Sequence, residues 1–192
     1  MMADILLANI VVMFAALIQT ASGIGFAMIA VPLLALVDLG YVPGPSLLAM
    51  LGLSLVMALR GWRDVDRQGL SALLAGLGIG TVVGALSLGA LPQSATGLLF
   101  GIMVLIALAA GQVGFVPGRS TPAFAFSGAV AGLMGTMAGI HGPALAVLYQ
   151  GAPPRTARAT IALIFIVASC LSLLSLHLSQ LFDRAGLLAG FA

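Results

Sequence analysis

Two short segments of this 192-residue chain combine polar side chains with glycine and proline inside long uncharged runs. The first segment holds Gln19, Thr20, Ser22, Gly23, Gly25 and Pro32, and the second holds Thr136, Gly139, His141, Gly142 and Pro143. Glycine and proline interrupt helices, and an interrupted helix frees backbone N–H groups. At a helix start such groups carry partial positive charge and bind anions. Amide, hydroxyl and imidazole donors nearby would complete a substrate site for a small anion. We expect the two segments to face each other across a shared cavity.

A purely structural interpretation of the same residues stays open. The glycines could serve close helix packing, and the serine and threonine hydroxyls could bond back to their own helices. His141 stands where Gly25 stands in the first segment. An imidazole inside a membrane is a candidate for proton coupling, because its charge changes near neutral pH. It could equally be a neutral side chain bonded to a helix carbonyl.

The composition indicates an integral membrane protein, with the lipid bilayer as its partner. Hydrophobic residues make up 61% of the chain and charged residues only 6%, whereas soluble domains carry roughly 25% charged residues. The formal net charge of +2 gives no reason to expect a nucleic-acid partner. With one cysteine and two histidines, we expect neither a metal nor a cofactor.

The spacing of charges predicts an all-α, polytopic helical membrane protein. Between Asp4 and Asp38 lie 33 uncharged residues, which as one helix would span about 50 Å against a hydrocarbon core of about 30 Å. The run 120–154 is similar. Both runs must be broken, with Pro32 and Pro143 among the helix-breaking residues. Further helices are predicted over 46–59, 69–91, 94–116 and 159–181. The helix predicted over 69–91 carries a stripe of small residues, Gly76, Gly80 and Gly84, which would let another helix approach closely.

Sequence similarity between the halves predicts a duplication. Residues 17–31 match 133–147 at six of fifteen positions, and 66–75 match 183–192 at six of ten. We therefore expect two tandem four-helix repeats with broken first helices. The first would cover 1–121, and the second, 122–192, would be incomplete, with about two helices and the start of a third. An even number of crossings per repeat would make the repeats parallel. An inverted arrangement, with the broken run folded back as a hairpin, stays open.

Arginine placement predicts a cytoplasmic amino terminus. The segment Arg60–Arg67, together with Arg119 and Arg184, would then lie in the cytoplasm, as the positive-inside rule requires. Arg155 and Arg158 would fall outside. There they would either break the rule or draw an anion toward the opening.

The paired motifs resemble those of the sulfite exporter TauE/SafE family. The resemblance rests on Ser22–Phe26 with Val31–Leu34, on Gly139–Leu145, and on Arg155–Thr160. It implies a multi-helix inner-membrane permease, built by duplication, for small anions such as sulfite or organosulfonates. Members generally continue through further helices that are missing here.

A transporter is thus the expected function, with proton coupling through His141 as an added hypothesis. An enzyme is not expected, because the chain has no glutamate, no lysine and no His-Glu-x-x-His pair. The alternative is a non-transporting membrane assembly or scaffold subunit, packed through Gly76, Gly80 and Gly84 around a dry centre. A homo-oligomer is compatible with both functions.

Overall fold

The computed structural model describes residues 2–90 and 118–178, together with the single positions 98, 102, 105 and 109. These residues form seven α-helices and two short 3-10 helices, η1 (Leu39–Tyr41) and η2 (Trp62–Asp64), and the described part contains no strand. The all-helical class predicted from sequence is confirmed. The helix expected over 94–116 and the repeat match at 183–192 lie outside the described residues.

The first long run folds back on itself as a helical hairpin. Helix α1 (Met2–Ser22) ends at the break, and α2 (Phe26–Val37) returns beside it, so that Leu34 lines one pocket together with Ala8 and Val12 of α1. The reversal is possible because Gly23 and Gly25 have φ values of 87° and 134°, a region that other residues rarely adopt. We call residues 19–25, the end of α1 and the break, the first tip.

The predicted helix break at Pro32 is wrong, because α2 runs through this proline without ending. Proline removes one backbone donor and strains its own turn, but a helix can continue past it with a bend. The glycine pair at the first tip, with two positive φ angles, reverses the chain instead.

The second long run forms a matching hairpin from α6 (Thr121–Ala138) and α7 (Gly142–Tyr149). Gly139 closes α6 in the left-handed conformation, and Pro143 stands in the first turn of α7, where a proline fits a helix start. The open ends of the hairpin also meet, since the ring centroids of Phe124 and Tyr149 are 6.5 Å apart. We call residues 136–143, from the end of α6 to the start of α7, the second tip.

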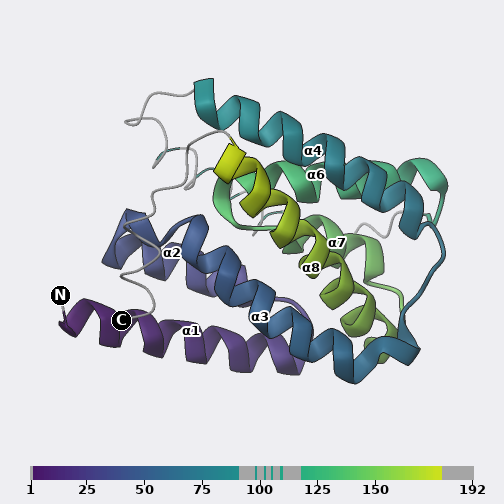
Figure 1. Ribbon diagram of the computed structural model, residues 1–192. Coiled ribbons are helices and arrows are strands. Elements are labelled where there is room, and N and C mark those ends of the chain that lie inside the picture. The colour runs from purple at the N-terminus through teal and green to yellow at the C-terminus, as the bar shows by residue number, and fades with distance from the viewer. Residues whose placement is uncertain are drawn as a thin grey trace.

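Six arginines gather at one end of the molecule, which we call the arginine end; they are Arg60, Arg63, Arg67, Arg119, Arg155 and Arg158. Helices α1 and α3 (Gly44–Gly61) run toward this end, and Thr20 and Arg60 line a common pocket there. Helices α4 (Leu70–Ala90), α6 and α8 (Pro154–Leu178) start from it (Figure 1). An ion pair between Asp66 and Arg119 and a hydrogen bond from the Asp66 N–H to Thr160 join these starts.

This arrangement corrects two predictions from the sequence. The arginine-rich loop after α3 lies opposite the amino terminus, not on the same side, because α2 turns back and does not complete a crossing. The long helices that follow the two broken runs also do not point the same way. Gly61 at the end of α3 packs on Ala159 near the start of α8, so these two long helices are antiparallel, as the folded-back alternative requires.

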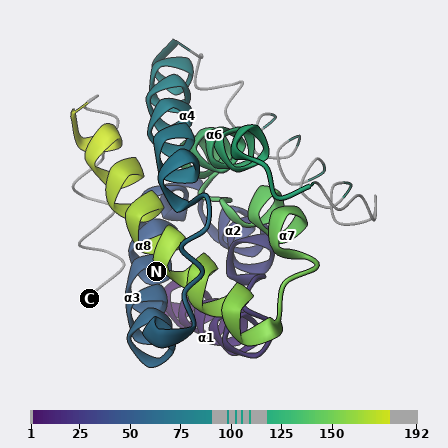
Figure 2. The same ribbon diagram turned by 90° about the vertical axis from the view of Figure 1, so that its right-hand side faces the viewer.

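Small residues join α4 to α6, which lie side by side (Figure 2) and run in the same general direction, since Gly76, Gly80 and Gly84 lie against Ala125, Ala129 and Leu133 in turn. A Cβ added at Gly76 or Gly80 would overlap the backbone of Ala125 or Ala129, and one at Gly128 would overlap Leu73. The stripe predicted from Gly76, Gly80 and Gly84 is therefore used inside the chain.

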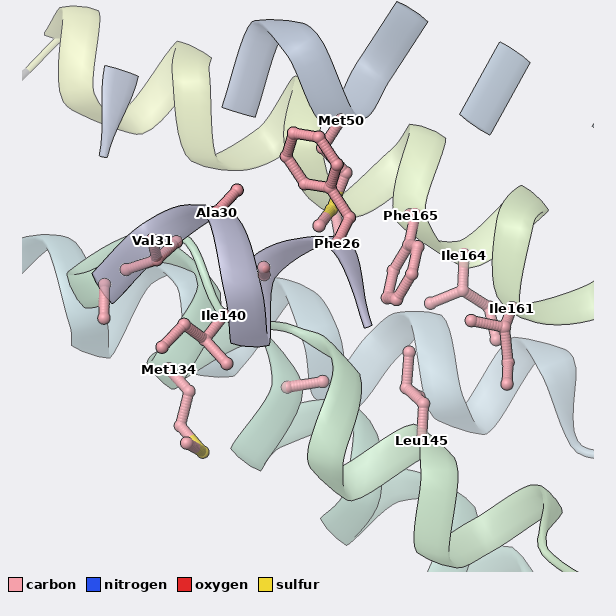
Figure 3. Close-up of a cluster of buried hydrophobic side chains, with 14 of the residues drawn as sticks. Phe26, Ala30, Val31, Met50, Met134, Ile140, Leu145, Ile161, Ile164 and Phe165 are labelled. Carbon is pink, nitrogen blue, oxygen red and sulfur yellow. The ribbon is translucent and has the colours of Figure 1, made fainter. Parts of the chain in front are cut away.

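Buried side chains of α2, α3, α6, α7 and α8 meet in one apolar cluster, which contains Phe26, Met50, Met134, Leu145 and Phe165 (Figure 3).

Four described helices are long and apolar enough to cross a membrane: Asp4–Ser22, Gly44–Asp64, Leu70–Ser87 and Pro154–Leu178. The two half-helices α2 and α7 are thus packed among longer helices, which is where a bilayer tolerates interrupted backbone.

Candidate functional site

The two hairpin tips are in direct contact inside the bundle. A Cβ added at Gly142 would lie 3.1 Å from Cγ2 of Ile24, and one added at Gly139 would lie 3.6 Å from Cγ2 of Val31. Segments more than one hundred residues apart in the sequence therefore meet, and the shared cavity expected between them stays a prediction. In both contacts a side chain from the first run lies against the backbone of a glycine from the second run. Ile24 therefore covers the start of α7.

Gln19 bridges the break at the first tip. Its side-chain oxygen accepts a hydrogen bond of 2.8 Å from the N–H of Phe26, the first residue of α2. The side chain is only 1% exposed, and its amide nitrogen has no hydrogen-bond partner among the described residues. Gln19 thus stabilises the start of α2 and keeps one buried donor available.

The hydroxyls of Thr20 and Ser22 are exposed and bond back to their own helix. They donate to the carbonyls of Leu17 and Ile18, each at 2.8 Å. Ser22 also accepts from the N–H of Ile24 at 3.3 Å. The self-bonding alternative therefore describes these two contacts, although both side chains remain at the surface of the tip.

The second tip is sealed. Thr136 and His141 are fully buried, and Gly139, Gly142 and Pro143 are buried with them. The hydroxyls of Thr136 and Ser172 are 2.8 Å apart, and the Ser172 hydroxyl lies 3.4 Å from Nε2 of His141. A polar chain thus links the end of α6, the second tip and α8.

The imidazole of His141 fits a space left by small residues. A Cβ at Gly135 would overlap the ring, and the ring centroid of Phe165 is 6.1 Å away. One face of the ring therefore lies on bare backbone, and the orientation of the ring follows from packing as well as from Ser172.

Each tip packs on the start of a long helix from the other half. A Cβ at Gly23 would overlap the side chain of Arg158 near the start of α8, and one at Gly139 would lie 3.1 Å from the hydroxyl of Ser46 near the start of α3. The contacts correspond, but their chemistry differs. The first tip borders on arginine, and the second borders on a serine and a proline.

A pocket of about 240 Å³ opens beside the first tip at the arginine end. We call it the arginine pocket; its polar lining is Thr20, Arg60, Asp64, Arg155 and Arg158. Of the predicted site residues, Thr20 alone reaches it. Of the predicted residues, Thr20 and Ser22 are thus exposed, whereas Gln19, Gly23 and the predicted residues of the second tip are buried.

Ser172 and Arg60 were missed from the sequence. Ser172 lies three residues after Ser169, and both are fully buried on α8, so a spacing of three within an apolar helix was the available signal. Arg60 ends a predicted helix and gave no sign that it would meet α8. Within the described residues, no group of three His, Cys, Asp or Glu side chains comes together.

Comparison with known proteins gives one family. No curated protein and no solved structure matches the chain. The family model described as sulfite exporter TauE/SafE matches residues 8–192, which includes both tips, all of α2 to α8 and the arginine pocket. This chain therefore belongs to the sulfite exporter TauE/SafE family of membrane transporters.

Proposed function

We propose that the chain moves a small oxyanion, sulfite or an organosulfonate, across the membrane by alternating access at the two hairpin tips. The observation that carries this proposal is the unequal burial of two tips in contact. Thr20 and Ser22 are exposed, whereas Thr136 and His141 are fully buried. A transporter that opens on one side at a time needs such an inequality, and the tips would exchange exposure during a cycle.

The passage would be lined by the residues of both tips. The amide nitrogen of Gln19 is a buried donor without a partner among the described residues. The hydroxyls of Thr20 and Ser22 would turn from their own helix to the anion. The positive dipole ends of α2 and α7 point at the tips, and the start of α7 would become available once Ile24 moves away from Gly142. Gly23, Gly25, Gly139 and Gly142 would let the backbone approach the anion closely. In the second tip, Thr136 and His141 would take over the anion or its proton.

The opposed directions of the two hairpins support an inverted repeat. Helices α1, α2 and α3 correspond in order to α6, α7 and α8, and α3 runs antiparallel to α8. In transporters with inverted repeats, one half rocks against the other around a central site. We infer that residues 1–121 and 122–192 are such repeats.

The arginine end supports an orientation. By the positive-inside rule, the end with six arginines faces the cytoplasm of an inner-membrane protein. The amino terminus then lies on the other side, which reverses the orientation expected from the sequence. The exposed first tip faces the cytoplasm in this orientation, as an exporter that loads from the cell requires.

Proton coupling would act through His141. The chain His141–Ser172–Thr136 is buried and hydrogen bonded, and a histidine changes charge near neutral pH. The packing of α6 on the glycine stripe of α4 is what the scaffold alternative also expects, so the transport measurement below has to separate the two functions.

Transport in proteoliposomes tests the proposal. Purified protein is reconstituted, and uptake of radiolabelled sulfite and methanesulfonate is measured for wild type, Ser22→Ala and His141→Gln, with Ser71→Ala, at an exposed position of α4, as control. We expect anion-selective uptake that both tip variants lower by about tenfold or more, the loss of one bond to a charged group, while the control leaves it unchanged.

Coupling is read separately, by imposing a proton gradient on the same vesicles. His141→Gln should abolish the response to the gradient. Uptake that both tip variants leave intact would refute the site, and absence of any anion flux in wild type would refute the transport function.

A further inference from the structure

We propose that the arginine pocket is itself an anion-binding site, the station at which a sulfite or sulfonate group is held before it passes the first tip. This rests on the proposed function for its role in transport. The binding site stands on separate observations, namely a cavity and three arginines around it.

Three positive side chains surround a small volume with little negative charge. Arg60, Arg155 and Arg158 line the pocket, and Asp64 is the one acidic residue in its lining, so the formal charge of the lining is +2. In the described part of the chain, none of the three arginines forms an ion pair with a carboxylate. Like charges held close together repel each other, and a bound anion removes that repulsion.

The backbone is built to bring these arginines together. Gly61 allows α3 and α8 to approach, since a Cβ added there would lie 3.0 Å from that of Ala159. This places Arg60 beside the first turn of α8. Gly23 leaves room for the Arg158 stem to lie across the first tip. Two glycines at close-contact positions therefore serve the same pocket.

The chemistry of the lining fits an oxyanion. A guanidinium presents two parallel N–H groups that match two oxygens of a sulfite or sulfonate. Helix α8 begins at Pro154, so its positive end points to the same place. The pocket volume of about 240 Å³ is several times the roughly 30 Å³ that one water occupies in the liquid, which leaves space for a short organic tail.

The pocket is also connected to the tip. Thr20 stands in its wall, and Arg158 rests on Gly23. An anion that draws Arg158 into the pocket therefore changes the packing of the first tip. We infer that loading of the pocket is sensed at the hairpin through this contact.

A binding titration tests the site without any need for transport. The full chain in nanodiscs of neutral phosphatidylcholine is titrated calorimetrically with sulfite and with methanesulfonate, and sodium gluconate serves as the ionic-strength control. Arg60→Gln, Arg155→Gln and Arg158→Gln should each weaken sulfite binding by about tenfold or more. Arg63→Gln is the matched control, because Arg63 lies in the same region over Trp62 and outside the pocket lining.

Folding and the source of the anion are controlled in the same experiment. Arg158→Lys keeps the positive charge but lacks the two parallel N–H groups of the guanidinium. This variant should bind sulfite with intermediate affinity. Each variant must keep its thermal unfolding midpoint. If wild type binds no soluble anion but binds phosphatidylglycerol in an arginine-dependent way, the pocket is a lipid headgroup site and the proposal is overturned. Equal loss in Arg63→Gln also overturns it.

The two proposals fail in different ways. Sulfite binding that depends on the three arginines, in a protein that moves no anion, would uphold the pocket and refute the transport function. Sulfite transport by wild type with no arginine-dependent binding would uphold the transport function and refute the pocket.

Discussion

Ile24 of the first tip lies over Gly142 of the second, so that a Cβ added to Gly142 would be 3.1 Å from Cγ2 of Ile24. This contact joins the two halves of the chain at the positions where both backbones are broken. It also covers the start of α7, whose cap residue His141 makes no capping hydrogen bond. An apolar side chain therefore closes a helix start that would otherwise attract an anion. We interpret Ile24 as the residue that seals the second tip from the first.

Truncation of Ile24 should loosen this seal. Replacing a fully buried isoleucine with alanine costs about 2–5 kcal/mol, and because Ile24 is half-buried we expect about 1–2 kcal/mol, or a rise of about 5–30-fold in the open population. The measurement is maleimide labelling of Thr136→Cys in a Cys170→Ser background, with and without Ile24→Ala.

Ile10→Ala provides the control for this measurement, because Ile10 lies on α1, the helix that leads into the first tip, and is 49% exposed. It should leave the labelling rate unchanged. Equal labelling rates with and without Ile24→Ala would show that the tips are not sealed by this contact.

The glycine contacts between α4 and α6 make a second prediction. A Cβ at Gly80 would overlap the carbonyl oxygen of Ala129, whereas a Cβ at Gly78 has nothing within 4 Å. Gly80→Ala should therefore destabilise the protein by about 1–3 kcal/mol through overpacking. Gly78→Ala, two residues away, should be neutral or stabilising by about 0.5–1 kcal/mol, because alanine favours the helix.

Thermal unfolding in detergent distinguishes these two substitutions. A drop in the midpoint for Gly80→Ala alone is the expected result. If both variants unfold at the wild-type temperature, α4 and α6 are not packed as closely as the structure has them.

The helices and their interruptions could be predicted from the sequence, because uncharged length and glycine content are local properties. The broken runs, the starts at Pro143 and near Pro43, and the small stripe of α4 all follow from such patterns. The direction of the chain after the break could not be predicted in this way. Whether Gly23 and Gly25 kink a helix or reverse it depends on two φ angles, which the surrounding packing decides.

The same limit explains which site residues were found. Tip residues such as Gln19 and His141 stand out because they are polar within apolar runs. Ser172 and Arg60 belong to the sites only because α8 packs beside the second tip and against the end of α3. Once the first hairpin folds back, Arg60 and Arg158 lie at the same end of the molecule. The prediction from sequence had placed these two arginines on opposite sides of the membrane.

The ion pair between Asp66 and Arg119 makes the third prediction, on the pH dependence of stability. It joins the loop before α4 to the start of α6, and the Arg119 guanidinium also lies 5.7 Å and 5.8 Å from the ring centroids of Phe124 and Tyr149. Burial raises the pKa of Asp66, but the hydrogen bond from Arg119, the N–H of Gln68 and the charge of Arg119 together hold that pKa below its ordinary value.

A carboxyl whose pKa is lower in the folded state stabilises the fold above its ordinary pKa, and this contribution is lost as the pH falls through the folded pKa. Because both partners are partly in contact with solvent, the contribution should be at most about 1 kcal/mol. Asp66→Asn should therefore lower the unfolding midpoint slightly at neutral pH. The difference from wild type should shrink at about pH 3, below the ordinary carboxyl pKa of about 3.9.

Arg63→Gln is the control, because Arg63 is a nearby exposed charged residue with no ion pair among the described residues and lies outside the arginine pocket. It should leave the unfolding midpoint at neutral pH unchanged. Equal unfolding midpoints for Asp66→Asn and wild type from neutral to acidic pH would show that Asp66 acts through its backbone contact to Thr160. In that case the N–H of residue 66, which the substitution keeps, and not its charge, would hold the start of α8 to the loop.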